Sequence, residues 1–292
     1  MKSILPFYFV FSLCYWLTIG KPHPVKAQII QPSTDYKSYP AVVTKPLDHY
    51  QRKVFVQGKD SLQYRILFPD NFNPQKSYPL VLMIHGMGER GNNNASQLNN
   101  GGAFFLDSAF RKAHPAIVVF PQCPLGTRWD SKMMPGTAEE QYGHAKTRWY
   151  WQYQKAANKD LQLLMDFVAD FTKRSGYIAQ SRCYVGGISM GAMTAFELAY
   201  RMPDTFAAGY FMSGGGNPVD IAEKLPHMAF RLMHGDADNV VDYSYSLRMY
   251  EALKAAGISV KLDTYPGLGH GPWNDTMFQE PGLMDWLFKY KK

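Results

Sequence analysis

The chain has 292 residues, of which 46% are hydrophobic and 19% are charged, which is enough apolar material to build the core of one large domain. This composition excludes disordered and collagen-like chains. The formal net charge is +7, but the basic residues are dispersed along the chain, which argues against a nucleic-acid partner.

The N-terminus carries the pattern of an export signal. Lys2 supplies a positive start, Ile4–Gly20 is an almost unbroken apolar run, and small residues stand at −3 and −1 before Gln28. We therefore expect residues 1–27 to be removed, leaving a secreted or periplasmic protein with no membrane contact. A retained anchor is the main alternative, because the run is near the lower length limit for a spanning helix. A lipid attached to Cys14 is a lesser one, since Leu13 is larger than such sites usually accept.

Strand signals follow a polar leader. Residues 28–59 are expected to form this leader and a first strand, and residues 60–292 a single domain. Several later runs are continuously apolar rather than alternating, which suits strands buried on both faces of a parallel sheet. Strands are predicted at Lys53–Gln57, Leu62–Phe68, Pro79–His85, Ala116–Pro121, Cys183–Gly187, Phe206–Met212, Phe230–Met233 and Val260–Tyr265.

Helical patterns lie between these strands. Apolar residues recur at helical spacing from Leu161 to Phe171 and from Leu247 to Ala256, with Gly176 and Gly257 placed to end the two helices. A last helix is expected at Leu283–Phe288. Strands alternating with helices predict an α/β domain whose mostly parallel central sheet is flanked by helices on both faces.

One turn between a strand and a helix has the pattern of a nucleophile site. Ser189 stands between Gly187 and Gly191, after the strand that begins at Cys183 and before a helical stretch through Arg201. A side chain at either glycine would collide with the neighbouring strand or helix. The turn exposes the hydroxyl, and the start of the helix offers backbone N–H groups to a developing oxyanion.

A serine hydroxyl needs a base to take its proton. His270 is the best placed of the histidines, because it follows the last strand in a loop with three glycines and lies downstream of Ser189. His85 and His234 end strands as His-Gly pairs and are expected to brace loops. The remaining histidines after the signal fall in the leader, in turns that precede strands or in an aperiodic stretch: His49, His114, His144 and His227.

An acid should orient the imidazole and stabilise its charged form. Three carboxylates follow the strand Phe230–Met233, namely Asp236, Asp238 and Asp242. Their position in the loop does not choose among them, and the other two are expected to cap a helix or tie down the loop.

Five motifs stand in chain order: HGMGERG (His85–Gly91), FPQCP (Phe120–Pro124), GGISMGA (Gly186–Ala192), HGDAD (His234–Asp238) and GHGPW (Gly269–Trp273). Together they resemble the α/β-hydrolases. Within that fold the chain is similar to secreted esterases and predicted peptidases related to feruloyl esterases, polyhydroxyalkanoate depolymerases and the prolyl oligopeptidase catalytic domain. The resemblance runs from Asp60 to the C-terminus and is more specific for the fold than for the substrate.

The resemblance implies roles for individual residues. It places the nucleophile at Ser189, the base at His270 and the acid at Asp238, which the loop alone had left open. The oxyanion hole would use the backbone N–H groups of Met87 and Met190. Glu89 and Arg90 also match the family, and we expect both to brace the loop.

Cysteine is scarce, and no pair or Cys/His spacing of a zinc site is present. The family's strand order places one strand between those of Cys123 and Cys183, which separates them by roughly 9.5 Å, beyond disulfide reach. We therefore expect two buried free thiols and no metal.

Residues 124–159 form an aperiodic, aromatic-rich stretch between two regular elements. Long connections of this kind are usually functional, and this one would lie on the nucleophile's side of the sheet as a cap. Trp129, Trp149, Trp151 and Tyr153 are predicted to wall the substrate site. The alternative is that these aromatics simply cover the helix that begins near Leu161.

These observations predict a secreted serine hydrolase that cleaves short-chain or aryl, feruloyl-type carboxylic esters, including esters on polysaccharides, and needs no cofactor. One alternative is a peptidase of the prolyl-oligopeptidase type. Those enzymes usually carry a propeller domain, which residues 28–49 are too short to supply. The other alternative is a catalytically dead, hydrolase-like binding protein.

Overall fold

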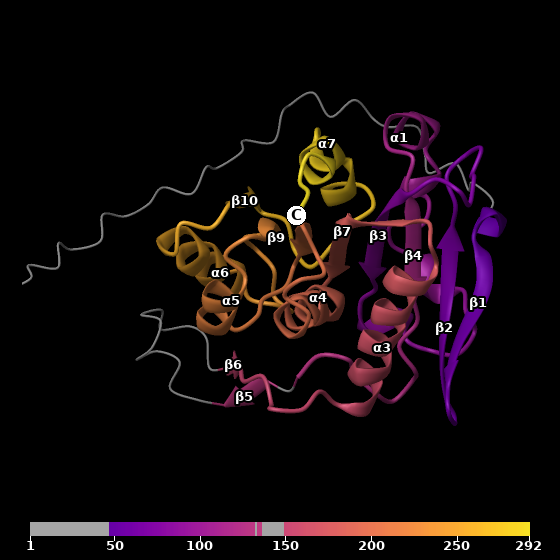
Figure 1. Ribbon diagram of the computed structural model, residues 1–292. Coiled ribbons are helices and arrows are strands. Elements are labelled where there is room, and N and C mark those ends of the chain that lie inside the picture. The colour runs from indigo at the N-terminus through magenta and orange to yellow at the C-terminus, as the bar shows by residue number, and fades with distance from the viewer. Residues whose placement is uncertain (1–46, 132, 136–148) are drawn as a thin grey trace, which may run out of the picture.

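The computed structural model describes residues 47–131, 133–135 and 149–292, so the predicted export signal and most of the leader lie outside the described residues. An eight-stranded sheet has the order β1-β2-β4-β3-β7-β8-β9-β10 (Figure 1). Its strands are β1 Gln51–Gln57, β2 Asp60–Leu67, β3 Tyr78–Ile84, β4 Ile117–Pro121, β7 Ile178–Ile188, β8 Ala208–Met212, β9 Ala229–Gly235 and β10 Val260–Tyr265.

The sheet is mostly parallel, as predicted. Six strands run parallel to one another, in the order β4, β3, β7, β8, β9 and β10. At one edge of this sheet, β1 pairs antiparallel with β2 and β2 pairs antiparallel with β4. The carboxyl ends of the parallel strands therefore meet at one edge of the sheet, where side chains from several strands can converge.

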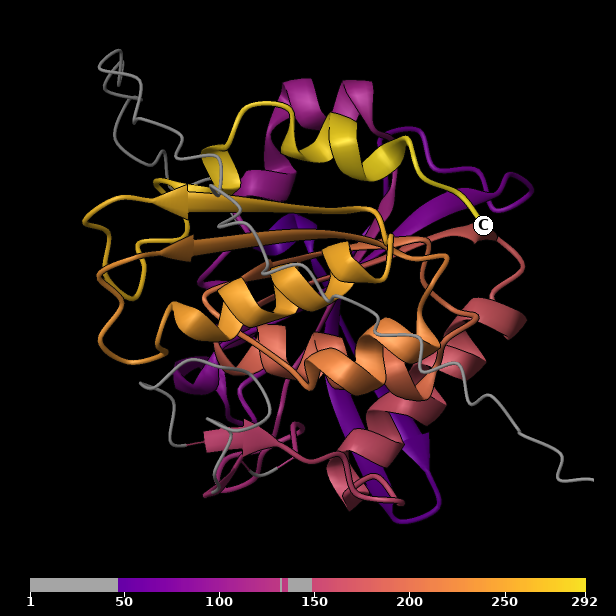
Figure 2. The same ribbon diagram turned by 90° about the vertical axis from the view of Figure 1, so that its left-hand side faces the viewer.

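Helices cover both faces of the sheet (Figures 1 and 2). One face carries α3 (Lys159–Arg174), α4 (Met190–Arg201), α5 (Pro218–Lys224) and α6 (Ser244–Ala255), and the other carries α1 (Ser108–Ala113) and α7 (Leu283–Phe288). Short 3₁₀ helices are η1 Leu47–His49, η2 Met87–Glu89, η3 Ser96–Leu98, η4 Phe104–Leu106 and η5 Met277–Gln279. The predicted α/β architecture is confirmed.

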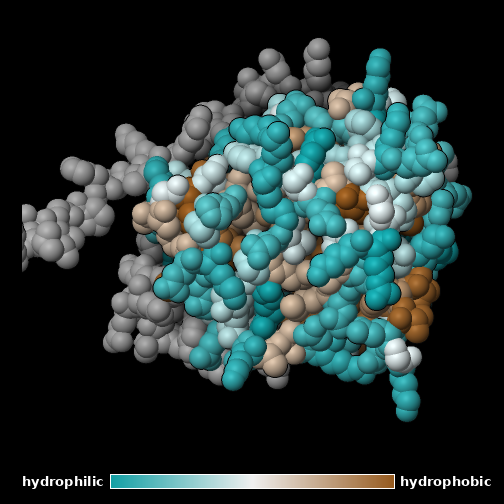
Figure 3. All heavy atoms as spheres, in the orientation of Figure 1, coloured by the Kyte–Doolittle hydropathy of each residue, from teal (hydrophilic) through white to brown (hydrophobic). Residues whose placement is uncertain are grey.

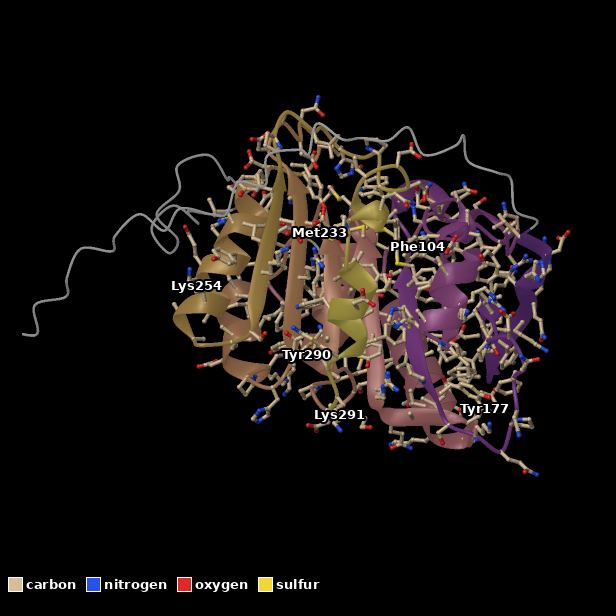
Figure 4. The ribbon with its side chains drawn as sticks, turned by 90° about the horizontal axis from the view of Figure 1, so that it is seen from above. Phe104, Tyr177, Met233, Lys254, Tyr290 and Lys291 are labelled. Carbon is tan, nitrogen blue, oxygen red and sulfur yellow. The ribbon has the colours of Figure 1, made fainter. Side chains whose placement is uncertain are left out.

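Strand β3 shows how the sheet divides the core. Leu80, Leu82 and Ile84 join the cluster under α3 to α6, whereas Val81 and Met83 join the cluster under α1 and α7. Successive side chains of a strand point to opposite faces, so an unbroken apolar run supplies both layers. Figure 4 looks down on the α7 face, where Met233 and Phe104 belong to the second cluster.

Besides the 3₁₀ helices, four short elements were not predicted: α1, α5, and the two strands β5 (Met133–Pro135) and β6 (Trp149–Trp151) of a small antiparallel sheet. The two helices bury only one and two side chains, and the two strands have three residues each, so none of the four shows a periodic pattern. The last two lie within residues 124–159, which the sequence predicted to be without regular structure.

Helix α4 holds both ends of that segment. The buried Glu197 carboxylate accepts hydrogen bonds from the backbone N–H and the hydroxyl of Ser131 at 2.6 and 2.7 Å. Arg201, which pairs with Glu197 at 2.7 Å, also donates to the carbonyl of Gln154 at 2.8 Å. The segment is therefore anchored to the helix that begins beside Ser189.

Cys123 and Cys183 are both buried and free, as expected. Strand β3 lies between β4 and β7, so the order of strands that separates them is also confirmed. Cys183 lies well inside its strand rather than near the start, because β7 already begins at Ile178.

The surface seen in Figure 3 is mostly hydrophilic, with a hydrophobic area over the edge strand β1, where Val54 and Val56 are exposed. Within the described ranges, none of the helices combines the length and the apolar character needed to cross a bilayer.

Candidate active site

Ser189 occupies a sharp turn between β7 and α4. Its φ of 51° and ψ of −120° lie in a region that non-glycine residues rarely adopt, at a cost of about 1–3 kcal/mol. The Ser189 N–H donates to the carbonyl of Met212 in β8 at 2.9 Å, which holds the turn to the sheet. The turn places the hydroxyl at the carboxyl edge of the sheet and at the positive end of α4.

Two glycines make this turn possible. A Cβ on Gly187 would lie 2.2 Å from the carbonyl oxygen of Gly191, and a Cβ on Gly191 would lie 2.2 Å from the carbonyl oxygen of Ile84. Both contacts are with backbone, which cannot move aside as a side chain can. The collisions that the motif predicted are therefore present, one within the turn and one against strand β3.

A hydrogen-bonded chain links three residues that are far apart in sequence. His270 Nε2 lies 2.9 Å from Ser189 Oγ, and His270 Nδ1 lies 2.7 Å from Asp238 Oδ2. Ser189 comes from the end of β7, Asp238 from the loop after β9 and His270 from the loop after β10. The Asp238 side chain is fully buried, and that of His270 is 15% exposed.

Asp238 is held as a carboxylate. Burial alone would raise the pKa of its carboxyl group, but hydrogen bonds from His234, His270 and the N–H groups of Val241 and Val240 outweigh burial and hold that pKa well below its usual range. Asp238 therefore presents a negative charge to His270 Nδ1, so Nδ1 carries the hydrogen and Nε2 is free to accept the serine proton.

The other two aspartates of the loop do not reach the imidazole. Asp236 Oδ1 accepts from the N–H of Gly267 at 2.6 Å, and Asp242 Oδ1 accepts from the N–H of Ser244 at 2.9 Å, where α6 begins. Asp236 thus ties one loop to another and Asp242 binds the start of a helix, which are the two structural roles that the sequence predicted for aspartates of this loop.

The two strand-ending histidines brace loops, as the sequence suggested. His85 Nε2 accepts from the N–H of Cys123 at 2.9 Å, and Nδ1 lies 2.6 Å from the carbonyl of Gly86. Burial lowers the pKa of His85 to about 4, so this imidazole is neutral at pH 7. His234 is also fully buried, but it contacts Asp238, which the sequence did not indicate.

The N–H groups expected to form an oxyanion hole come from two strand ends. Met87 follows β3 and Met190 is the first residue of α4. Among the described residues, neither N–H has a hydrogen-bond partner, so both are available to a ligand.

The loop after β3 is braced by its charged residues. Arg90 donates to the carbonyls of Met87 at 3.0 Å and Thr127 at 2.7 Å. The Glu89 carboxylate accepts from Asn100 at 3.0 Å, and burial raises the pKa of its carboxyl group. Both residues make the bracing contacts expected of them.

The predicted aromatic wall requires a correction at Trp129 and Trp151. Trp129 has no exposed surface and packs near the His85 ring at a centroid distance of 5.4 Å, so it lies behind the site. Trp151 is 3% exposed and packs edge-on against Tyr245 at 4.8 Å. The Tyr153 ring lies beside that of Tyr200 at 4.8 Å. Trp129 and Trp151 thus anchor the segment in the core, and Tyr153 is partly buried against it. The side chain of Trp149 lies outside the described residues.

Glycines in the loop after β8 allow this anchoring. A Cβ on Gly215 would lie 3.1 Å from the Trp151 ring, and one on Gly216 would lie 2.8 Å from the Tyr153 hydroxyl. The aromatic residues thus pack directly onto backbone. Sequence reasoning missed this, because aromatic side chains look the same in a sequence whether they line a pocket or fill a core.

Sequence reasoning also missed a contact that fixes the His270 loop. The Trp273 indole N–H donates to Ser213 Oγ at 3.1 Å, and the Trp273 ring lies edge-on to the imidazole of His270 at 5.1 Å. Ser213 is fully buried at the end of β8.

In the part of the chain that the structure describes, no three histidine, cysteine or carboxylate side chains are grouped as metal ligands would be.

Residues 73–280 match a family model described as phospholipase/carboxylesterase. Lysophospholipase-like protein 1 of Mus musculus is 31% identical over 99 residues, which is 32% of this chain and 41% of the mouse protein. Acyl-protein thioesterase 1 of Neurospora crassa is 26% identical over 213 residues, which is 65% of this chain and 79% of that protein. The chain thus spans about two fifths of the length of the mouse relative.

Solved structures share the fold. A thermostable esterase has a TM-score of 0.71 at 24% identity, covering 84% of this chain and 64% of the esterase chain. A ferulic acid esterase has a TM-score of 0.60 at 17% identity, covering 82% of this chain and 98% of that chain. At these identities the likeness extends to the fold alone.

Proposed function

The chain belongs to the phospholipase/carboxylesterase family of α/β-hydrolases, and we propose that Ser189, His270 and Asp238 are the catalytic triad with which it works. The protein is a carboxylic ester hydrolase. The observation that carries the assignment of the triad is the unbroken chain of hydrogen bonds from Ser189 Oγ through His270 to Asp238 Oδ2.

The first half of the reaction forms an acyl-enzyme. Ser189 Oγ bonds to the ester carbonyl carbon while its proton passes to His270 Nε2. The N–H groups of Met87 and Met190 hold the resulting oxyanion, each worth roughly 10²–10³ in kcat. When the intermediate collapses, the bond to the leaving oxygen breaks and the proton on His270 passes to the departing alcohol.

The second half releases the acid. Water gives a proton to His270 Nε2 as its oxygen attacks the acyl carbon, and the bond to Ser189 Oγ then breaks as the same proton returns to that oxygen. Asp238 stays ionised throughout and stabilises the imidazolium that forms twice in each cycle.

Covalent labelling tests this assignment. A fluorophosphonate probe should label the wild-type protein and fail to label Ser189→Ala, and ester hydrolysis should fall on the order of 10⁴- to 10⁶-fold in that variant. The protein should stay folded, because alanine removes only a small hydroxyl. An alanine variant that keeps its activity would overturn the triad, and a wild-type protein that neither labels nor hydrolyses esters would favour a binding protein.

For the substrate, we propose short-chain or aryl esters of the feruloyl type. Two exposed apolar side chains support this choice. Met87 follows β3, the strand beside β7, and Leu125 follows β4, the strand beside β3. Met87 is 40% exposed and Leu125 is 76% exposed. With the edge of Trp273 beside His270, they offer apolar contact to a small acyl or aromatic group. Thioesters are a second candidate, since a relative is named an acyl-protein thioesterase.

A matched substrate series tests the choice. Esters with acyl chains of two to ten carbons, a methyl ferulate, a thioester and a peptide amide would be compared by kcat/KM. We expect the short and aryl esters to lead and the amide to react poorly. A steady rise with chain length would overturn the preference, and a dominant amidase activity would favour the peptidase alternative.

Export is part of the proposal. The apolar run Ile4–Gly20 and the small residues before Gln28 support removal of residues 1–27. Mass spectrometry of the protein recovered outside the cytoplasm should find Gln28 at its N-terminus. Full-length chain in the membrane fraction would instead favour a retained anchor.

A further inference from the structure

The acid of the site accepts hydrogen bonds from two histidines. Asp238 Oδ2 lies 2.7 Å from His270 Nδ1 and 3.2 Å from His234 Nε2. The side chains of His234 and Asp238 are both fully buried, so no solvent competes for this contact. One carboxylate oxygen thus interacts with an imidazole on each side.

The partners of His234 determine where its hydrogen lies. Nε2 is 2.9 Å from the carbonyl oxygen of Val241 as well as 3.2 Å from Asp238. A carbonyl and a carboxylate can only accept, so Nε2 carries a hydrogen and donates to both. On the other side of the ring, Nδ1 lies 2.7 Å from the oxygen of Ser246, whose hydroxyl donates to the carbonyl of Gly214 at 2.8 Å.

His234 connects the acid to rigid elements. It lies in β9, and Ser246 lies in α6. Asp238 sits in a loop whose residues Asp236, Asn239 and Val240 are exposed. Without the strand-borne imidazole, the contacts that hold the Asp238 carboxylate would come from N–H groups of its own loop and from the His270 that it has to orient.

We infer that His234 is a positioning residue for Asp238 and, through it, for His270. Its Nε2–H fixes the plane of the carboxylate and shares the oxygen that His270 uses. Because Asp238 Oδ2 accepts from both histidines, it is a weaker acceptor for His270 than it would be alone. The hydrogen bond from His234 thereby sets how strongly Asp238 stabilises the charged form of His270. This inference rests on the proposed triad.

Among the described groups that hydrogen-bond to His234, Asp238 is the charged one. Tyr243, which precedes α6, lies edge-on at 5.8 Å between ring centroids, and burial raises the pKa of its phenol, so it is neutral. Strand β10 places Thr264 opposite His234, and α6 contributes Ser246. The loop after β10 contributes His270, which meets the same carboxylate.

Two substitutions separate the hydrogen bond from the bulk of the ring. In His234→Gln the side-chain amide can still reach Asp238 and Val241 with an N–H, whereas in His234→Asn the amide is one bond too short. We expect His234→Asn to lower kcat roughly 10- to 100-fold, the cost typical of losing a group that orients a catalytic partner. KM should be unchanged, and His234→Gln should recover most of the loss.

The pH profile distinguishes positioning from a purely structural role. Without the second donor, Asp238 stabilises the imidazolium of His270 more strongly, so the acid limb of kcat/KM in His234→Asn should move to higher pH. His114→Asn is the matched control, because His114 precedes β4 at the opposite edge of the sheet and pairs with Asp285. It should leave the profile in place.

The outcomes are distinguishable from a failure of the triad itself. A folded His234→Asn with the wild-type kcat and pH profile, alongside an inactive Ser189→Ala, would overturn this inference alone. A folded His234→Gln no better than His234→Asn would also overturn it. If His234→Asn does not fold, Ser246→Ala provides the test, because it releases the ring while leaving His234 intact; we expect the same shift of the acid limb, and an unmoved profile would overturn the inference.

Discussion

Helix α4 begins so close to strand β3 that a Cβ on Gly191 would lie 2.2 Å from the carbonyl oxygen of Ile84 and 2.5 Å from that of His85. Both neighbours are backbone atoms of the segment that leads to the Met87 N–H. The same contact therefore joins the nucleophile's helix to the loop of the proposed oxyanion hole.

This contact predicts the effect of Gly191→Ala. The methyl group cannot be accommodated unless α4 or β3 shifts, so we expect a loss of stability at the upper end of roughly 1–3 kcal/mol together with a fall in kcat. Thermal unfolding and ester kinetics measure the two effects. Gly88→Ala is the control for stability, because no neighbouring atom lies within 4 Å of a Cβ there. Equal stability of the two variants would contradict the argument.

The loop after β9 offers three matched substitutions. Asp238→Asn should lower kcat by about 10⁴-fold, because the imidazole loses the carboxylate that orients it. Asp236→Asn and Asp242→Asn should cost far less, since these carboxylates accept from backbone N–H groups of Gly267 and Ser244. Steady-state kinetics on one ester would rank the three. A larger loss at Asp236 than at Asp238 would show that the acid has been misassigned.

His85 should make stability depend on pH. Burial lowers its pKa from 6.5 to about 4, so between these values the unfolded chain binds a proton that the folded protein does not. The contribution of His85 to the free energy of unfolding is complete above pH 6.5 and is lost as the pH falls toward 4. Over this range the free energy of unfolding falls by up to about 3 kcal/mol. Urea unfolding at pH 7.5, 5.5 and 4.5 would measure it.

The comparison variant for this titration is His85→Gln, whose amide oxygen can accept from the Cys123 N–H but does not titrate. Its stability should fall less steeply over the same pH range, since the other acid-sensitive groups remain. Parallel curves for the variant and the wild type would show that His85 does not carry the effect.

Trp273 and Ser213 should act as one unit. Trp273→Phe keeps an aromatic ring but loses the N–H that donates to Ser213 Oγ, and Ser213→Ala removes the acceptor. We expect each to lower kcat by several-fold, as for the loss of a hydrogen bond worth about 1 kcal/mol. The double variant should be little worse than either, and Trp286→Phe on α7 should have no such effect. Losses that multiply in the double variant would mean the two residues act separately.

Local patterns were sufficient for much of the fold. The apolar run of β3 predicted a strand buried on both faces, and its alternate residues do belong to the two core clusters. The expected bounds of β10 and α7 match those observed. Helix α7 has only six residues, but four of its side chains are apolar and buried. The short helices α1 and α5 bury one and two side chains, too few to show an apolar face in the sequence.

The sequence by itself determined the succession of strands and helices and the glycine-flanked turn at Ser189, because these depend on residues that are near one another in the chain. The resemblance to the family placed the acid at Asp238, and the structure shows that this carboxylate and not that of Asp236 reaches His270. Tertiary structure alone decided that His234 shares the same carboxylate and that Trp129 and Trp151 face the core. Each of these contacts joins segments that are distant in sequence or depends on how a loop folds back, and a one-dimensional pattern carries no record of either.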